Sequence, residues 1–344
     1  MKVGTVCTGL ATGEFAAKAL EKLNKGALEV EVLFGCDIDP DAKALFLASH
    51  PEAIWYEDVF DKSFSKAPPV DLFMAGFPCQ SFSSEGLQLG VGDARGTVIY
   101  AILKYIRANE PSAVMLENVA GLAHLFPEVL LMICTELKEA GYLVGWRKLN
   151  TKVHGGLPQT RTRVYIVAVS KNCARGPLNT VWPDEVPMAS LKSLLSQPIK
   201  YGPGLPSGAG ARKKVRKGIH FLKRAGVNHK SAPVACDCDG RGPGRLTVNY
   251  IPCLTATRAT GGGFWIMCKG GKLSVAEMMR FQGMRLNQFP KKAVLAVNAT
   301  KLSKMIGNAF TQSVVQAILA KLLPLAGLSR SNHLRSGIGS SKTC

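Results

Sequence analysis

Long apolar runs are absent from this chain of 344 residues. No stretch approaches the roughly 18 apolar residues that a membrane-spanning helix needs, and the N-terminus lacks the charged-then-apolar layout of a secretory signal. We therefore expect an intracellular monomer with no membrane partner. It would reside in the nucleus of a eukaryotic cell, or in the nucleoid or cytoplasm of a bacterial one.

Cys-x-x-Cys pairs and internal repeats are also missing. Ten cysteines are spread through the chain, several inside apolar segments such as Val6-Cys7, which suits buried reduced thiols better than a disulfide framework. The Cys-x-x-Cys spacing of structural zinc sites is lacking at Cys236, Cys238, Cys253 and Cys268, so we expect no metal. The lack of a repeat excludes solenoids and propellers.

Acidic residues are few, with 24 Asp and Glu against 43 Lys and Arg, which gives a net charge of +19. Such an excess favours a polyanionic partner, nucleic acid first, although a solvated surface without a partner would carry it equally well. Residues 200–245 hold 11 Lys and Arg against 2 Asp. The candidate phosphate contacts in this stretch are Arg212, Lys213, Lys214, Arg216 and Lys217. The alternative is a solvated linker, and residues 213–217 also resemble a nuclear import signal.

Short apolar strands alternate with helical patterns over the first half of the chain. The expected strands cover residues 3–7, 30–36, 54–56, 72–75, 113–116 and 164–169. This alternation predicts an α/β fold built on a parallel, doubly wound sheet. Apolar residues at helical spacing predict one long helix over residues 302–323.

The composition changes after residue 170, where proline, glycine and then basic residues accumulate. We expect a large catalytic, cofactor-binding domain at residues 1–175 and a small, mostly irregular or β domain at 176–297. Residues 298–325 would return to the large domain as a helix. Residues 326–344, rich in serine and glycine, have too few apolar groups to offset the entropy of ordering and would form a disordered tail.

Two features at expected strand ends suit a nucleotide-like ligand. A glycine loop at residues 9–13 follows the first strand, where glycine lets the backbone approach a ligand closely. Asp37 follows the second strand and could accept hydrogen bonds from ribose hydroxyls, or it could cap the helix that begins at Pro40. Asp58 follows the third strand and could accept from an exocyclic amine, or it could serve as a capping or surface carboxylate.

Three reactive groups follow or precede other strands. Cys79 stands in a loop after an apolar strand, as cysteine nucleophiles do, although a free cysteine is often a small packing residue. Glu117 ends the next strand, where apolar surroundings would raise its pKa and keep it protonated. Arg161 and Arg163 are two residues apart, so an extended backbone would point both to one side, where they could hold a phosphate or a carbonyl oxygen.

Four motifs occur in one order: Phe77-Pro78-Cys79-Gln80, Glu117-Asn118-Val119, Gln-x-Arg-x-Arg at 159–163 and Gly307-Asn308-Ala309. Together they resemble the DNA cytosine-5 methyltransferase family. The resemblance implies a Rossmann-like domain that binds S-adenosylmethionine and a smaller target-recognition domain. It also implies transfer of a methyl group to carbon 5 of a flipped-out cytosine in DNA, through a covalent bond between Cys79 and cytosine C6.

The resemblance also implies roles for individual residues. Cys79 would be the nucleophile, Glu117 the acid facing the base and Arg163 the contact to the base carbonyl. The implied cofactor residues are Cys7, Gly9, Leu10, Asp37, Ile38, Asp58, Val59 and Asn308. The implied substrate contacts are Pro78, Gln80, Asn118 and Arg161, with the basic residues of 212–217.

Two other functions stay open from the sequence. The first is an RNA cytosine-5 methyltransferase, of the type that modifies tRNA, although the Cys-Phe-Thr signature of that branch is not found. The second is a nucleic-acid-binding module without catalytic activity, against which the presence of Cys79, Glu117, Arg163 and Asn308 argues.

Overall fold

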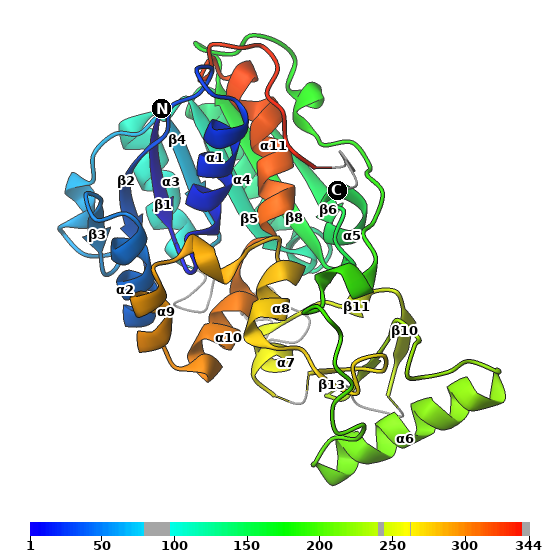
Figure 1. The fold of residues 1–344 in the computed structure, drawn as a ribbon. Coiled ribbons are helices and arrows are strands. Elements are labelled where there is room, and N and C mark those ends of the chain that lie inside the picture. The colour runs from blue at the N-terminus through cyan, green and yellow to red at the C-terminus, as the bar shows by residue number, and fades with distance from the viewer. Residues whose placement is uncertain (79–96, 240–243, 262, 339–344) are drawn as a thin grey trace.

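The computed structural model of the protein describes residues 1–78, 97–239, 244–261 and 263–338. Two lobes are visible in Figure 1, a larger one around a broad sheet and a smaller one below it. Among the described residues, no helix combines the length and the apolar character that crossing a membrane requires.

The large lobe is built on a seven-stranded sheet with the order β3-β2-β1-β4-β5-β8-β6. Its strands are β1 (Lys2–Val6), β2 (Glu31–Cys36), β3 (Ile54–Tyr56), β4 (Leu72–Ala75), β5 (Ala113–Val119), β6 (Tyr142–Asn150) and β8 (Thr162–Ser170). β1 to β5 pair in parallel, as predicted. The prediction of an all-parallel sheet is wrong at its far side, where β8 runs antiparallel to both β5 and β6.

The reversal at β8 follows from the length of its connection. Only residues 151–161 separate β6 from β8, and a parallel return needs a crossover of about a dozen residues or more. β6 itself was not predicted, because it lies at the edge of the sheet and leaves its middle residues exposed, Trp146, Arg147 and Lys148 among them. An exposed edge strand carries no continuous apolar run.

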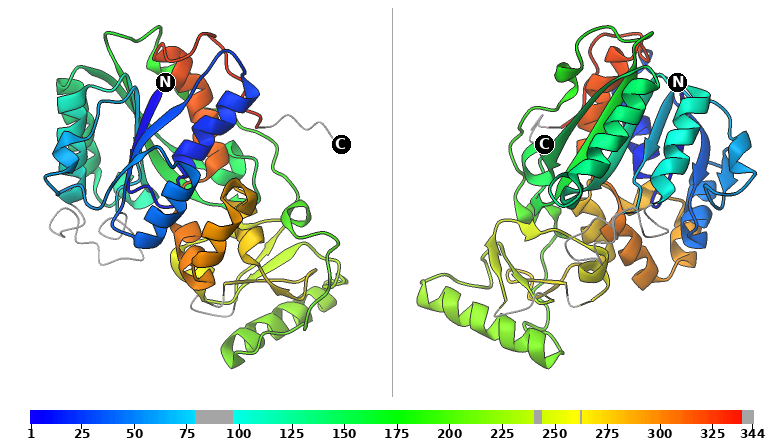
Figure 2. Two further views of the ribbon diagram at one scale, coloured as in Figure 1. Left: turned by 60° about the vertical axis from the view of Figure 1, so that its left-hand side comes forward. Right: turned by 180° about the vertical axis from the view of Figure 1, so that it is seen from behind.

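Helices cover both faces of the large sheet (Figures 1 and 2). On one face, α1 (Thr12–Leu23) and α11 (Gln312–Leu325) share a core cluster with the sheet, through residues such as Ala16, Leu20 and Ile318. On the other face, α3 (Val98–Asn109) and α4 (Pro127–Glu139) form a second cluster around Ile102 and Ile133. Burial on both faces explains why β1, β4 and β5 read as apolar runs.

The small lobe centres on a four-stranded sheet with the order β10-β9-β12-β13. Its strands are β9 (Val234–Asp237), β10 (Leu246–Val248), β12 (Phe264–Ile266) and β13 (Gly271–Lys272). Its helices are α6 (Ala209–Arg224), α7 (Ala256–Thr260), α8 (Val275–Phe281), α9 (Lys291–Ala296) and α10 (Ala299–Asn308). A short parallel pair, β7 (Gln159–Thr160) with β11 (Ile251–Pro252), joins the two lobes. α2 (Pro40–Ser49), α5 (Thr151–His154) and the 3-10 turns Phe64–Lys66, Ala120–Ala123, Leu178–Val181, Leu191–Leu194 and Leu286–Gln288 complete the regular structure.

The predicted long helix over 302–323 is two helices. α10 ends at Asn308, Ala309 takes an extended conformation (φ −62°, ψ 154°), and α11 begins at Gln312. α11 shares a core cluster with the large sheet, whereas α10 packs mainly on α7 and α8 of the small lobe. Apolar periodicity continues through the break, so the pattern alone could not reveal it.

The first part of the predicted disordered tail is tied to the large lobe. The Asn24 amide donates to the Arg335 carbonyl (3.0 Å) and accepts from its N–H (2.8 Å), and Gln316 donates to the Ser336 carbonyl (2.6 Å). Main-chain and amide hydrogen bonds order this segment despite its few apolar groups. Residues 339–344 lie outside the described part of the chain.

Candidate active site

The loop after β1 has an unusual backbone. Cys7, Gly9 and Ala11 all have positive φ, at 54°, 52° and 51°. This left-handed conformation is disfavoured for residues with a Cβ, so two of the three positions carry local strain of the kind often found at functional sites. No described atom lies within 4 Å of where a Cβ at Gly9 would stand, so the backbone faces open space there.

Asp37 links the end of β2 to this loop. One carboxylate oxygen accepts from the Gly9 N–H (2.9 Å) and the other from the Asp39 N–H (3.0 Å). Its alternative role as a helix cap is wrong, because Asp39 caps α2 by accepting from the Asp41 N–H (2.9 Å). Burial raises the pKa of Asp37 above its usual value. The carboxylate therefore stands at the meeting point of two strand ends.

The other predicted cofactor residues of this half lie around Asp37. The Ile38 side chain is 77% exposed beside it, an unusual position for an aliphatic group that contributes nothing to the core. Asp58 accepts from the Phe60 N–H (3.1 Å), and Val59 is partly buried against the core. The Leu10 side chain is buried in a core cluster, so only its main chain is available to a ligand.

Glu117 and Arg163 form an ion pair at the junction of β5 and β8. The Arg163 Nε lies 3.2 Å from Glu117 Oε1, and both side chains are largely buried, at 13% and 9% exposure. The antiparallel register sets Arg163 opposite Val119, two residues beyond Glu117. Burial raises the pKa of Glu117, against the opposing fields of Arg163 and Arg161, as the sequence predicted. Glu117 Oε1 has no hydrogen bond of good geometry among the described residues.

Arg161 is bound mainly to main-chain carbonyls, whereas Arg163 pairs with a carboxylate, and the predicted contact of Arg161 with a substrate stays a prediction. Its guanidinium is 2% exposed and donates to three main-chain carbonyls, those of Leu254 (3.0 Å), Gly307 (3.1 Å) and Ala309 (2.7 Å). The expected strand is interrupted, because β7 ends at Thr160 and β8 begins at Thr162. Arg161 stands between the two strands, so the alternation of a continuous strand does not apply to it.

Gly307 and Asn308 of the last motif lie at the end of α10. A Cβ at Gly307 would come within 2.5 Å of the Thr255 and Ala256 main chain, so only glycine allows α10 to pack this closely on α7. The Gly307 carbonyl is one of the three that Arg161 binds. The Asn308 side chain is exposed.

Asn118 holds the segment that leads to the predicted nucleophile. Its side chain is buried, donates to the Phe77 carbonyl (3.3 Å) and accepts from the Val119 N–H (2.8 Å). Asn118 therefore positions the end of the loop that carries Pro78, rather than standing free for a substrate. Cys79 and Gln80 lie outside the described residues.

One residue of this site was missed by the sequence reasoning. Cys253 receives contacts from Arg161 Nη1 and Arg163 Nη2, both at 3.7 Å. Burial alone would raise the pKa of Cys253, but the two arginines and their hydrogen bonds bring the pKa below the usual thiol value. Its place after the short β11 strand gave no signal, since the contact depends on how the two lobes meet.

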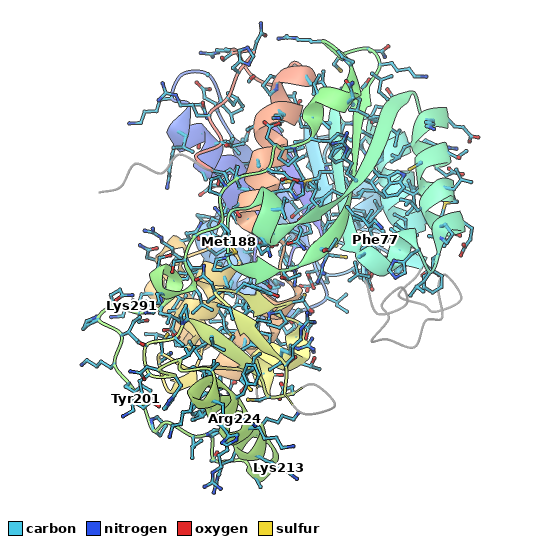
Figure 3. All side chains as sticks on the ribbon, turned by 90° about the vertical axis from the view of Figure 1, so that its right-hand side faces the viewer. Phe77, Met188, Tyr201, Lys213, Arg224 and Lys291 are labelled. Carbon is cyan, nitrogen blue, oxygen red and sulfur yellow. The ribbon has the colours of Figure 1, made fainter. Side chains whose placement is uncertain are left out.

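The five predicted basic contacts all lie on α6, far from Glu117 in the fold. Figure 3 shows Lys213 and Arg224 at the far end of the small lobe and Phe77 at the border of the large one. Lys214 donates to the Cys238 carbonyl (3.0 Å) and Arg212 to the Pro206 carbonyl (3.1 Å), so both also hold the lobe together. The structure therefore separates this basic group from the reactive one.

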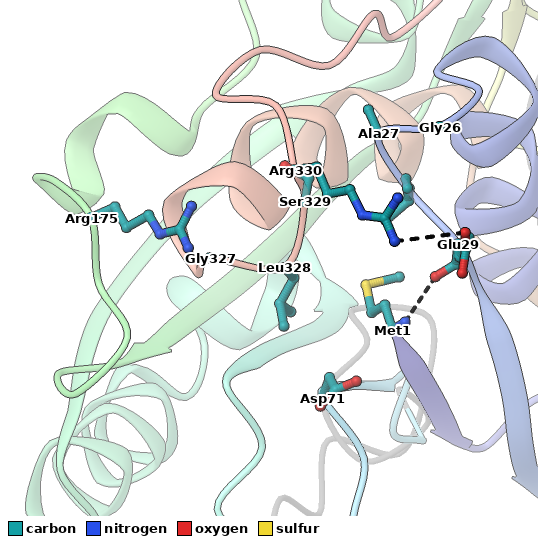
Figure 4. A pocket seen from close by; sticks show the side chains of 11 residues that line it. Met1, Gly26, Ala27, Glu29, Asp71, Arg175, Gly327, Leu328, Ser329 and Arg330 are labelled. Atoms are coloured by element: carbon teal, nitrogen blue, oxygen red, sulfur yellow. Dashed lines mark hydrogen bonds and ion pairs between the residues drawn. The ribbon is translucent and has the colours of Figure 1, made fainter.

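A pocket of about 600 Å³ lies at the opposite edge of the large sheet, near the amino ends of its strands (Figure 4). Glu29 contacts the Met1 amino group through its main chain (2.8 Å) and Arg330 through its side chain (3.9 Å). Asp71 accepts from the Lys2 N–H (2.6 Å). The charged groups of this pocket therefore interact with residues near the two ends of the described chain, namely Met1, Lys2 and Arg330. Within the described residues, no three His, Cys, Asp or Glu side chains gather as a metal site requires.

Comparisons with known proteins agree with the motifs. The profile of the C-5 cytosine-specific DNA methylase family matches residues 11–201. The Type II methyltransferase M.NgoBV of Neisseria gonorrhoeae is 33% identical over 156 residues, 43% of this chain and only 37% of that protein's length. The Type II methyltransferase M.NgoBI of the same organism is 29% identical over 317 residues, covering 87% of this chain and 88% of the relative. Among solved structures, S. pombe Dnmt2 methyltransferase aligns over 94% of this chain and 98% of its own, with a TM-score of 0.65 and 15% identity, which supports the fold alone.

Proposed function

Since the chain belongs to the C-5 cytosine-specific DNA methylase family, we propose that it transfers a methyl group from S-adenosylmethionine to carbon 5 of cytosine in DNA. The observation that carries the proposal is the buried pair of Glu117 and Arg163 at one end of β5 and β8. The pair stands beside Phe77, whose carbonyl Asn118 holds, and Phe77 leads directly to Pro78 and Cys79. Cys79, two residues after Phe77 in the sequence, would supply the thiol at the edge of the sheet where this acid and this cation stand.

The described residues fit S-adenosylmethionine. The open backbone at Gly9 offers its carbonyl group, Asp37 offers carboxylate oxygens for ribose hydroxyls, and the exposed Ile38 offers an apolar surface for an adenine ring. Asp58 and Val59 would meet the adenine edge, while Cys7, Leu10 and Asn308 would complete the site. When bound, S-adenosylmethionine supplies an electrophilic methyl group.

The side chains of the protein would supply the activation of cytosine, whose C5 is a weak nucleophile. The thiolate of Cys79 would form a bond to C6, and the displaced electron pair would make C5 nucleophilic. The protonated Glu117 would donate to N3 and relieve the charge that develops in the ring, while Arg163 would bind the O2 carbonyl. After methylation of C5, loss of its proton and breakage of the C–S bond would restore the aromatic ring and the free thiolate.

Glu117 suits the role of a proton donor because burial favours its neutral form. Its Oε1 is buried and has no well-aligned hydrogen bond among the described residues, although Arg163 Nε lies 3.2 Å away, so a base that entered the site would supply the missing partner. A cytosine in a duplex cannot reach this edge, so the base must leave the stack at a cost of a few kcal/mol. Contacts to both lobes would offset that cost.

The test is transfer of labelled methyl groups from S-adenosylmethionine to cytosine-containing DNA and RNA of matched sequence. We expect label on DNA, recovered as 5-methylcytosine, and loss of transfer in Cys79→Ala with DNA binding retained. Label on RNA alone would favour an RNA methyltransferase. Binding without label on either polymer would favour a module without catalytic activity. Covalent trapping on DNA that contains 5-fluorocytosine would test the bond between Cys79 and C6 directly, since fluorine at C5 cannot leave as a proton does.

A further inference from the structure

Helix α6 carries an extreme charge. Its 16 residues include seven Lys and Arg and no acidic residue. The sequence allowed a flexible linker here, but the segment is a continuous helix that runs along the outer edge of the small lobe (Figure 1). Seven like charges on one helix repel each other, so they are costly unless a partner of opposite charge compensates them.

The apolar side of α6 is already used by the fold. Val215, Gly218 and Leu222 are buried against the small sheet. A Cβ at Gly218 would come within 2.9 Å of Met267 and 3.0 Å of Leu246, so glycine permits the close packing. A basic amphipathic helix binds a membrane by burying its apolar side in lipid. Apart from Phe221, which is 63% exposed, α6 presents no exposed large apolar side chain, so lipid has little to bind and the partner of α6 must be recognised mainly by charge.

Six of the seven basic residues of α6 fall into two rows along the helix. Spacings of four and seven residues place side chains on nearly the same side of a helix. One row holds Arg212, Arg216 and Lys223, and the other holds Lys213, Lys217 and Arg224. Lys213, Arg216 and Lys217 are exposed, and none of the three has an ion-pair partner within the described part of the chain.

A pocket of about 550 Å³ adjoins the first row. Arg212 and Arg216 line it from α6 and Lys272 lines it from β13, with Pro203, Leu205 and Trp265 among the apolar residues. Lys272 also donates to the Gly261 carbonyl (3.3 Å). Three cations on a concave surface suit an anion with several oxygens, such as a phosphate group.

Resting on the proposed function, we propose that α6 and this pocket form a second DNA-binding surface, which holds the phosphate backbone of duplex DNA outside the catalytic site. The helix is about 24 Å long, enough to lie along roughly seven phosphates of one strand. The catalytic groups stand where the two lobes meet, whereas α6 lies at the distal edge of the small lobe (Figures 1 and 3). The chain therefore contacts DNA at two places, the catalytic site on one side of the small lobe and α6 on the other. The bound duplex must extend well beyond the target cytosine.

The test measures DNA affinity against salt concentration, without methyl donor, for the full chain. The double variant Lys213→Gln/Lys217→Gln removes two cations from the row that holds Lys213, Lys217 and Arg224. The control, Lys25→Gln/Lys171→Gln, removes two exposed cations at the opposite edge of the large lobe. Each phosphate contact contributes about 0.9 to the slope of log K against log salt, so the α6 variant should lose about 2 from the slope and the control almost nothing.

The dependence of DNA affinity on duplex length provides a second test of binding at α6. The wild-type chain should bind a duplex of about 30 base pairs more tightly than one of about 12, and the α6 variant should bind both with similar affinity. The proposal would be overturned if the α6 variant and the control had the same salt slope and the same dependence on duplex length. It would also be overturned if the α6 substitutions reduced affinity for single-stranded RNA of the same length as much as they reduce affinity for duplex DNA. Because binding is measured without methyl transfer, a chain that binds in this way but never methylates DNA would count only against the proposed function.

Discussion

Replacing Glu14 by glutamine should change how the stability of the protein depends on pH. Glu14 lies in the first turn of α1, is 1% exposed and accepts a short hydrogen bond from Thr5 Oγ1. Thr5 Oγ1 also contacts Thr8 Oγ1 (2.8 Å), which connects Glu14 to the loop at Gly9. Burial raises the pKa of Glu14 from 4.5 to about 7, against the opposing hydrogen bonds from Thr5 and from its own main chain.

The sign and size of the effect follow from linkage. Below pH 4.5 the carboxyl is protonated in both folded and unfolded chains, and its contribution to stability is fully present. Between pH 4.5 and about 7 the unfolded chain ionises while the folded one stays neutral, so the free energy of unfolding falls. A pKa difference of about 2.5 corresponds to about 3 kcal/mol, and no further loss occurs above pH 7.

The assay is urea unfolding of wild type and Glu14→Gln across pH 4 to 9. Glutamine keeps the acceptor for Thr5 but cannot ionise, so the difference in unfolding free energy should grow by about 3 kcal/mol in favour of the variant between pH 4 and pH 8. Thr5→Val removes a hydrogen bond that lowers the pKa of Glu14 and should move the transition to higher pH. Parallel curves for wild type and Glu14→Gln over the whole range would refute the reasoning, whatever their constant offset.

Three further predictions concern the candidate site. Glu117→Gln should reduce kcat about 100-fold or more while DNA affinity stays within a few-fold, because only proton donation to the base is lost; single-turnover methylation would measure it, and an unchanged kcat would exclude Glu117 as the acid. Arg161→Met should lower the free energy of unfolding by about 3 kcal/mol or more, since three buried carbonyls lose a charged donor; a loss under 1 kcal/mol in urea unfolding would contradict this. Asp37→Asn should weaken S-adenosylmethionine binding about tenfold by calorimetry, whereas Asp39→Asn, which alters only the cap of α2, should leave it unchanged; equal effects in both variants would assign the loss to local structure.

The parallel part of the large sheet was predictable because its strands are buried on both faces and read as apolar runs. β6 and α6 were not, for opposite reasons: the edge position of β6 removes the apolar pattern, and the charge of α6 masked its helical periodicity. Only three residues of α6 are buried, Val215, Gly218 and Leu222, and a glycine among them adds no apolar signal.

The candidate site shows a similar division. The positions of Glu117 and Arg163 could be predicted because both lie within strands of regular register, where position in sequence fixes position on the sheet edge. The orientation of Arg161 could not be predicted because this residue stands between two strands. Cys253 was missed because its neighbours come from another lobe. Sequence periodicity describes a residue within its own element, whereas contacts between lobes depend on how those elements pack.

The contacts of Arg161 and Arg163 make the reactive edge depend on both lobes. Arg163 pairs with Glu117 of the large sheet and also contacts Cys253, which begins the small-lobe segment that continues to Leu254. Arg161 also contacts Cys253 and donates to the Leu254 carbonyl. A shift of this small-lobe segment would therefore move the surroundings of Arg163 and change the field on Glu117, whose raised pKa the proposed proton donation requires. Because the same lobe carries α6, the segment at Cys253 and Leu254 is one physical link between contact of α6 with DNA and the protonation of Glu117.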